Sequence, residues 1–169
     1  VGMAGPATSI QDFGRYGWQR YGLGPAGALD RFALAAANAL VRRPVNAAAV
    51  EIGPFATHFH VVDGAVHFAL FGADRLIKVG PEKVAMSMTG YAAAGETIAL
   101  GPARGGVFTY LAFAGGITGC DVLGSMSVHA RAGLGSPYAR PLKAGDLLEI
   151  ERCRSWQSEQ SLSSTTETE

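Results

Sequence analysis

Cysteine is scarce in this sequence, and its two cysteines lie far apart. Cys120 and Cys153 do not have the spacing of a metal site. Small domains that depend on disulfide bonds are much richer in cysteine. We therefore expect both thiols to be reduced, in a cytoplasmic protein.

Long hydrophobic runs are also missing. No stretch approaches the roughly 18 consecutive apolar residues of a membrane-spanning helix. The first residues do not combine a basic segment with an apolar core, as a secretory signal would. These two absences predict a soluble, unexported chain with no membrane partner.

The sequence has no excess of charge of either sign. Lys plus Arg and Asp plus Glu both number 14, so the formal net charge is zero. The absence of a basic excess argues against nucleic acid as a partner and favours a small substrate or another protein. With 169 residues, of which 48% are hydrophobic, the chain is long enough for one domain with a substantial core.

Only one segment has clear helical periodicity, from about Asp30 to Arg43. Asp30 is a good N-cap, and Pro44 ends the run. Asn38 is expected to tie the helix to a neighbouring strand. The apolar residues that recur at helical spacing, and so define the expected buried face, are Phe32, Ala35, Ala36, Ala39 and Leu40.

From Ala48 to Ile150 the pattern changes to short apolar or alternating runs, which Gly, Pro and Asp separate. Their lengths are those of strands. No helical segment separates these strands, so we expect a mainly β, antiparallel barrel or folded sandwich. The side chain of Glu51 would then face either the interior or solvent. The runs are "AAVEI", "THFHVV", "VHFALFG", "LIKV", "KVAMSM", "ETIALG", "VFTYLAFAGG" and "DLLEI".

The last residues have a different composition. Residues 153–169 are rich in Ser, Thr and Glu and have no apolar periodicity. Such a segment buries too little apolar surface to order itself. We expect one domain over residues 1–152, followed by a disordered polar tail.

The string "GLGPAG" at residues 22–27 matches the Gly-x-Gly-x-x-Gly pattern of dinucleotide-binding turns. A helix follows it, and Glu51 is the acidic residue beyond. However, the preceding "SIQDFGRYGWQRY" is not the apolar strand that such a fold needs, and Pro25 lacks an N–H for a phosphate. We favour a tight turn that leads into the helix.

Histidine offers a second alternative. His58 and His60 point to one face of an expected strand, with His67 nearby, as in a metal-binding barrel. A further histidine and a carboxylate at suitable spacing are missing, and His129 is isolated. A solvated strand face is the preferred interpretation, and no metal site is predicted.

Several blocks occur together in the order of one known family. They include Gln-Asp-x-Gly-Arg at residues 11–15, Gly-Ala-Leu-Asp at 27–30, Ala-Asn at 37–38, Ala-Gly-Gly-Ile at 114–117 and Gly-Ser-x-Ser at 124–127. From about Gly5 to Ile150 the sequence resembles the biotin-dependent carboxyltransferase-like family. That family includes KipA, which is the C subunit of the ATP-dependent 5-oxoprolinase, and the corresponding part of urea carboxylase. It is often labelled allophanate hydrolase subunit 2.

The resemblance implies a cyclophilin-like β-barrel, usually followed by a second barrel with a cleft between the two. The sequence resembles the first half only. The implied activity is ATP-dependent opening of 5-oxoproline to glutamate, together with two partner subunits of 5-oxoprolinase, one KipI-like and one LamB/YcsF-like. Two alternatives remain open: a biotin-dependent carboxyltransferase domain of the urea carboxylase type, and a non-catalytic module that binds a KipI-like protein.

The sequence departs from the family pattern at three places. Arg42 stands where members commonly carry glycine after the helix, and glycine is the residue best suited to a left-handed C-cap. Val128 and His129 replace the usual Thr and an acidic or polar residue. The segment "SPYAR" replaces a glycine-rich turn before Arg140, and that turn would line the cleft.

The family blocks also supply the candidate site residues for the substrate or ATP cleft. Arg15 has the planar donor fork that suits a carboxylate or phosphate, and Asp12 pairs with it or polarises a nucleophile. An equally good interpretation is an Asp–Arg pair that pins a turn. Small residues expose backbone N–H groups, so the 124–127 segment suggests an anion-holding loop, to which Arg140 adds charge. The complete candidate set is Gln11, Asp12, Arg15, Gly124, Ser125, Ser127 and Arg140, with Asp30 and Asn38 in structural roles.

Overall fold

The computed structural model describes residues 1–151. The tail expected at residues 153–169 and the Cys153 thiol lie outside the described residues. In residues 1–151, no helix is long and apolar enough to cross a membrane.

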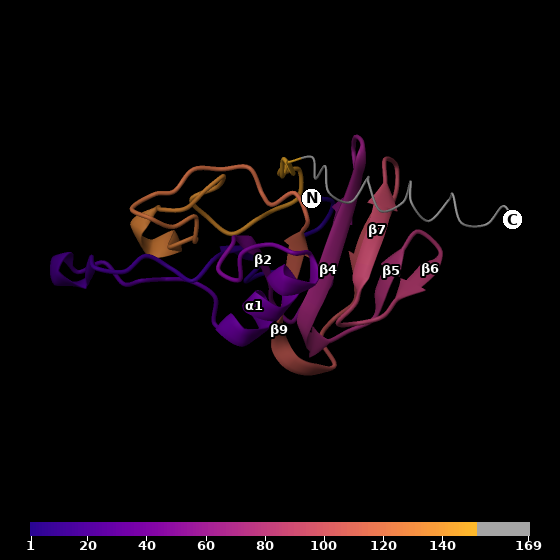
Figure 1. Cartoon of the computed structure of the whole chain (residues 1–169), viewed down its shortest axis with the longest axis horizontal. Helices are drawn as coiled ribbons and strands as arrows, with labels where there is room; N and C mark the ends of the chain where they lie inside the picture. The colour runs from indigo at the N-terminus through magenta and orange to yellow at the C-terminus, as the bar shows by residue number, and fades with distance from the viewer. Residues whose placement is uncertain (152–169) are drawn as a thin grey trace, which may run out of the picture.

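The chain folds into two antiparallel sheets and one main helix, α1 (Arg31–Leu40). In spatial order, the five-stranded sheet contains β1 (Ser9–Gln11), β2 (Ala49–Ile52), β9 (Gly105–Phe113), β4 (Ala65–Asp74) and β7 (Thr89–Ala93). The four-stranded sheet contains β3 (Thr57–His60), β8 (Thr97–Leu100), β5 (Ile77–Val79) and β6 (Glu82–Val84). Two short 3₁₀ turns are η1 (Gln19–Tyr21) and η2 (Ala130–Ala132). The mainly β, antiparallel fold with one main helix is confirmed (Figure 1).

The main core lies between the two sheets. It contains Leu70 of β4 and Leu111 of β9 from the first sheet, and Phe59 of β3 and Leu100 of β8 from the second. Each of these side chains is almost completely buried. Burial of a large apolar side chain contributes about 1.5–3 kcal/mol, so this shared core holds the sheets together.

The other face of the five-stranded sheet is covered by α1. Because side chains alternate along a strand, Tyr110 and Ala112 of β9 point away from the main core. They pack with Ala33, Leu34 and Ala37 of α1 in a second apolar cluster. All of β2, the centre of β4 and the C-terminal half of β9 are therefore buried on both faces.

The helix is shorter than expected, and its buried face is a different one. Phe32, in the expected buried face, is 75% exposed, and Ala39 is also exposed. The buried residues are Ala33, Leu34, Ala37 and Asn38. The expectation was wrong because almost every residue of "RFALAAANAL" is apolar, so no polar stripe fixes which side faces the sheet.

Both ends of α1 have recognisable caps. Asp30 accepts a hydrogen bond from the Ala33 N–H at 2.9 Å, which confirms the N-cap. At the other end, the N–H groups of Arg42 and Arg43 donate to the carbonyls of Ala39 and Asn38, at 3.0 and 2.9 Å. This is a Schellman motif, and Arg42 occupies its left-handed position with φ +57°.

Asn38 ties the helix to a loop rather than to a strand. Its side-chain amide donates to the carbonyls of Val45 and Ala47, at 3.3 and 2.8 Å, in the turn between α1 and β2. The structural role of the buried Asn38 side chain is therefore to stabilise this turn.

Four strand expectations need correction. Of the run "KVAMSM", only Lys83 and Val84 lie in a strand, β6. The run "DLLEI" forms no strand, and only Ile150 makes an isolated antiparallel bridge, to Ile117. The structure adds β1, in a segment that looks too polar for a strand, and β7, in "TGYAA". Pairing with the buried strands β2 and β4 explains both, because a short strand is stabilised by its neighbour more than by its own composition.

Candidate functional site

The Asp12 carboxylate is the centre of a buried polar cluster beside β1. It accepts hydrogen bonds from the hydroxyls of Ser125 and Ser127 and from the N–H groups of Gly14 and Met126. The Ser125 and Met126 bonds are 2.6 and 2.7 Å long. Ser127 closes the cluster by accepting from the Asp12 N–H at 2.9 Å. One carboxylate thus connects two segments that lie more than 100 positions apart in the sequence.

Arg15 binds backbone carbonyl groups of the segment that contains Ser125 and Ser127. Its guanidinium donates to the carbonyls of Val122 and Ser125, at 3.2 and 3.4 Å, and to that of Ser127. Only 1% of Arg15 is exposed. This burial lowers the pKa of the guanidinium, and the Asp12 charge opposes part of that shift. Arg15 therefore donates to the carbonyl groups of this loop, and Asp12 accepts from its hydroxyl and N–H groups.

Gln11 binds the next residue of this loop, Val128. Its amide nitrogen donates to the Ser9 hydroxyl at 2.9 Å and to the Val128 carbonyl at 3.2 Å. The Val128 N–H donates to the carbonyl of Ile10 at 2.9 Å. The 122–128 loop, which we call the glycine-serine loop, is thereby fixed along β1 and the residues that follow it.

Two N–H donors of the glycine-serine loop already have acceptors within the protein. The Met126 N–H bonds to the Asp12 carboxylate, and the Ser127 N–H bonds to the Ser125 hydroxyl at 3.0 Å. The loop does hold an anionic group, as its sequence suggests, but that group is the side chain of Asp12. Gly124 is the exposed exception, with φ +80° and open space where a Cβ would lie.

Arg140 lies apart from this cluster. Its guanidinium forms two 2.7 Å hydrogen bonds to the Asp146 carboxylate and lies 4.8 Å from the centroid of the Tyr138 ring. These bonds hold the pKa of Asp146 below its usual value. None of the Arg140 contacts reaches the glycine-serine loop, so the expectation that Arg140 adds charge there needs correction. The prediction for Arg140 was wrong because Asp146, six residues later, binds its guanidinium with both carboxylate oxygens.

The "GLGPAG" segment is a structural turn at the base of a projecting loop. The Arg15 N–H donates to the Pro25 carbonyl at 2.7 Å, and the Ala28 N–H donates to the Asp12 carbonyl at 2.8 Å. Gly27 has φ +93°, and a Cβ there would lie only 2.8 Å from the Gly14 nitrogen. The glycine is therefore required by two backbones in close contact. The turn delivers Asp30 to the start of α1.

A second buried polar cluster joins the start of α1 to the sheet, and the sequence did not reveal it. The Tyr110 hydroxyl donates to the Glu51 carboxylate at 2.6 Å and accepts from the Asp30 N–H at 2.9 Å. Glu51 also accepts from the Leu29 N–H at 2.9 Å. Burial raises the pKa of Glu51, and its two hydrogen bonds oppose the shift. Glu51 thus faces α1, which settles the alternative that its strand position left open.

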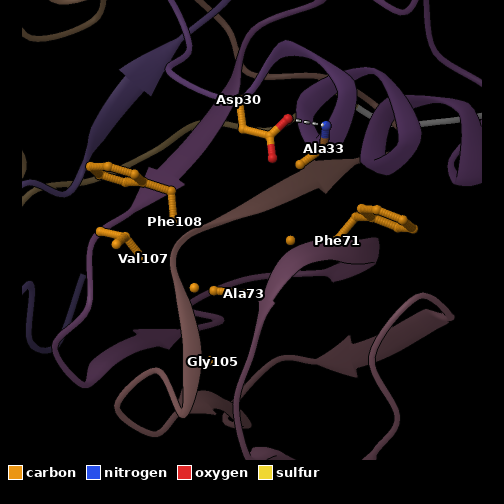
Figure 2. Close-up of a pocket in the computed structure, with 9 residues that line it drawn as sticks. Asp30, Ala33, Phe71, Ala73, Gly105, Val107 and Phe108 are labelled. Carbon is orange, nitrogen blue, oxygen red and sulfur yellow. Dashed lines mark hydrogen bonds between the residues drawn. The ribbon is translucent and has the colours of Figure 1, made fainter.

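A shallow pocket of about 400 Å³ opens next to this cluster. The N-cap residue Asp30 and Ala33 of α1 lie on one side, and Phe71 of β4 and Phe108 of β9 form apolar walls (Figure 2). The Asp30 carboxylate is engaged with the Ala33 N–H inside this pocket. The pocket lies on the helix-covered side of the five-stranded sheet and includes none of the seven expected cleft residues.

Arg75 is a third buried anchor that sequence reasoning missed. It donates to the Thr109 hydroxyl at 2.8 Å and to the carbonyls of Gly53, Phe55 and Gly101. Burial lowers the pKa of this guanidinium. Its partners are mostly carbonyl groups, which have no sequence signal, so its role emerges only from the fold.

Three of the four histidines lie on strands of the two sheets, and His129 precedes η2. His58 and His60 lie on β3, and the His60 ring contacts the Thr97 hydroxyl at 2.6 Å. His67 lies on β4, with its ring centroid 5.0 Å from that of Tyr91. Within residues 1–151 no group of three His, Cys, Asp or Glu side chains is placed to hold a metal ion. Cys120 is a free, exposed thiol.

Comparison with known proteins supports the family resemblance. Over 153 residues the chain is 38% identical to the C subunit of 5-oxoprolinase from Escherichia coli, covering 89% of this chain and 48% of that protein. It is 30% identical to urea amidolyase of Saccharomyces cerevisiae, over 88% of this chain and 8% of that one. The chain thus spans about half the length of the first relative.

The fold comparison agrees. The crystal structure of Kluyveromyces lactis urea carboxylase matches with a TM-score of 0.83 and 29% identity, over 90% of this chain and 14% of that one. The model of the carboxyltransferase domain, subdomain A and B, matches residues 21–169. This chain is therefore a member of the carboxyltransferase domain family, subdomain A and B.

Proposed function

We propose that this chain is one component of a multi-subunit, ATP-dependent enzyme that opens 5-oxoproline to glutamate in the cytoplasm, and that it corresponds to the C subunit of 5-oxoprolinase. The observation that carries the proposal is the 38% identity to that protein of Escherichia coli. A second relative with the same name, from Haemophilus influenzae, is 31% identical. The partners in the proposal are the KipI-like and the LamB/YcsF-like subunits of the enzyme.

The candidate residues of this chain do not fit the phosphates of ATP. Arg15 is buried and donates to three carbonyl groups, and Arg140 is held by Asp146. The N–H groups of Met126 and Ser127 are also engaged. A phosphate site needs donors that face the ligand. In this proposal the rest of the assembly binds ATP.

The contribution of the cluster is to position the glycine-serine loop. Asp12 and Arg15 fix both sides of that loop, so the exposed turn at Gly124 is presented from a rigid base. Catalytic geometry tolerates displacements of only a fraction of an ångström, so such positioning has a direct effect on rate. Asp12, Arg15, Ser125 and Ser127 are positioning residues in this proposal.

A second candidate function is carboxyl transfer from biotin to urea or a similar amide. The structural match to urea carboxylase of Kluyveromyces lactis, with its TM-score of 0.83, favours this alternative. Biotin is a cofactor only under this alternative.

One reconstitution experiment separates the two. The chain is fused to the second half of the Escherichia coli relative, in place of the half that it matches. The fusion is then mixed with the KipI-like and LamB/YcsF-like partners of that enzyme. The proposal expects glutamate from 5-oxoproline, dependent on ATP. The native Escherichia coli protein is the positive control.

Two outcomes would overturn the proposal. Labelled carboxyl transfer from a biotinylated carrier to urea, without glutamate formation, would support the carboxyltransferase. A fusion that copurifies with the KipI-like partner but is inactive in both assays would support the non-catalytic binding module.

A further inference from the structure

The loop between Asp12 and Asp30 projects from the body of the molecule, with η1 at its end (Figure 1). We call residues 16–24 the arm. Tyr16 is 51% exposed and Tyr21 is 66% exposed. The hydrogen bonds within the arm are local, from Tyr21 and Gly22 back to Trp18 and Gln19. The arm therefore presents large aromatic side chains to solvent.

The end of the arm has the composition of an interaction hot spot. The rings of Trp18 and Tyr21 have centroids 5.9 Å apart, and the Arg20 guanidinium lies 4.8 Å from the Tyr21 ring. Trp, Tyr and Arg are the residues most enriched where protein interfaces gain most of their affinity. On the arm these three side chains are gathered in a single turn.

The base of the arm is rigid, although its end is exposed. The two sides of the loop are joined by bonds from Arg15 to Pro25 and from Ala28 to Asp12. On the body side, Asp12 and Arg15 are locked into the glycine-serine loop. A preorganised arm loses little conformational entropy when a partner binds it.

Two segments at this end of the molecule lack acidic residues. Residues 13–29 and 122–140 contain no Asp or Glu, although the whole chain is neutral. Arg20 of the arm and Arg131 of η2 are exposed. The two segments lie close together, since a Cβ on Gly24 would be 3.6 Å from the His129 ring. A complementary partner surface is therefore acidic, with apolar space for aromatic rings.

From these features we propose that the arm is the docking element for an acidic face of the KipI-like partner. The proposal rests on the function proposed above, which supplies the identity of the partner. Aromatic side chains provide the buried contact area, and Arg20 and Arg131 provide the charge match.

The test measures binding of the full chain to the purified KipI-like partner. Tyr21→Ala and Arg20→Glu should each raise the dissociation constant of the complex at least about tenfold. Increasing salt from about 50 to 500 mM should weaken the wild-type complex, because exposed charges are screened. Thermal unfolding of both variants should match the wild type, since their contacts are confined to the arm.

Matched controls lie at the opposite end of the molecule (Figure 1). Lys83→Glu on β6 repeats the charge change of Arg20→Glu, and Tyr91→Ala on β7 repeats the loss of an exposed tyrosine. Both controls should bind the KipI-like partner like the wild type. Equal effects of arm and control variants, or no effect of the arm variants, would overturn the proposal. Displacement of that partner by a short oligonucleotide would also overturn it, in favour of a nucleic-acid surface.

The outcomes separate this proposal from the proposed function. If the arm variants lose binding while no assembly forms glutamate, the docking proposal stands and the enzyme assignment fails. If glutamate forms and the arm variants behave as wild type, the enzyme assignment stands and the docking proposal fails.

Discussion

The Tyr110 hydroxyl donates a 2.6 Å hydrogen bond to the Glu51 carboxylate beneath the first turn of α1. Tyr110 lies on β9, and Glu51 lies on the neighbouring strand β2. The Tyr110 hydroxyl also accepts a hydrogen bond from the Asp30 N–H. The start of the helix is thus attached to the sheet by polar as well as apolar contacts.

This relationship predicts a pH dependence of stability. Burial raises the pKa of Glu51 above its usual value of 4.5, so the folded protein holds this proton more tightly than the unfolded chain. Its contribution to stability is therefore full below about pH 4.5 and is lost as the pH rises through the raised pKa. Urea unfolding of Glu51→Gln, followed from about pH 4.5 upward to neutral pH, should lack this component. A wild-type-like pH profile in that variant would contradict the assignment.

The Asp12 cluster predicts a large loss of stability on truncation. In Asp12→Ala, four buried or half-buried donors lose their acceptor, and each such loss costs about 1–3 kcal/mol. We expect the free energy of unfolding to fall by at least about 3 kcal/mol. Ser125→Ala is the milder comparison, with a loss of about 1–2 kcal/mol, because it removes a single hydroxyl. Equal losses in both variants, measured by urea unfolding, would show that the carboxylate is not the centre of the cluster.

Arg42 predicts a difference in stability between two substitutions. Its left-handed conformation costs a residue with a Cβ about 1–2 kcal/mol, and glycine avoids this cost but adds unfolded-state entropy. We expect the free energy of unfolding of Arg42→Gly to exceed that of Arg42→Ala by about 0.5–1 kcal/mol, because both variants lack the side chain and only alanine keeps the Cβ. Urea unfolding of the two variants measures this difference, and equal stabilities would contradict the strain at this position.

The N-cap of α1 predicts a pair of unequal effects. Asp30→Ala removes the acceptor of the Ala33 N–H and should cost about 1 kcal/mol. Asp30→Asn keeps an acceptor oxygen and should change stability by only a few tenths of a kcal/mol. Chemical unfolding of the two variants measures the difference, and a similar loss in both would indicate that the charge of Asp30, rather than its capping bond, is stabilising.

The fold was predictable where apolar and polar residues alternate clearly along the sequence. On β3, the buried positions Thr57 and Phe59 alternate with His58 and His60, and the strand lies where the pattern places it. On α1 the contrast disappears, so the helix was predicted but its buried face was not. For β1 the local composition was misleading, because pairing with β2 outweighs it.

The candidate site was predictable only in part, for a related reason. The structure brings together Gln11, Asp12, Arg15, Ser125 and Ser127, which family blocks had identified despite their separation along the chain. It leaves Arg140 with Asp146. Glu51, Tyr110 and Arg75 were missed because their partners are hydroxyl, N–H and carbonyl groups that only long-range pairing brings within reach.

The one-sided placement of α1 divides the molecule into a constrained and a permissive half. Strand β9 has a neighbour on each face, whereas Lys78 of β5 and Lys83 of β6 are exposed on the four-stranded sheet, which α1 does not cover. Substitutions at outward positions of β5 and β6 should therefore cost less stability than substitutions at the buried Tyr110 and Leu111 of β9. The same outward lysines are suitable places for a fluorophore or surface tether, because a label there leaves the arm and the glycine-serine loop untouched.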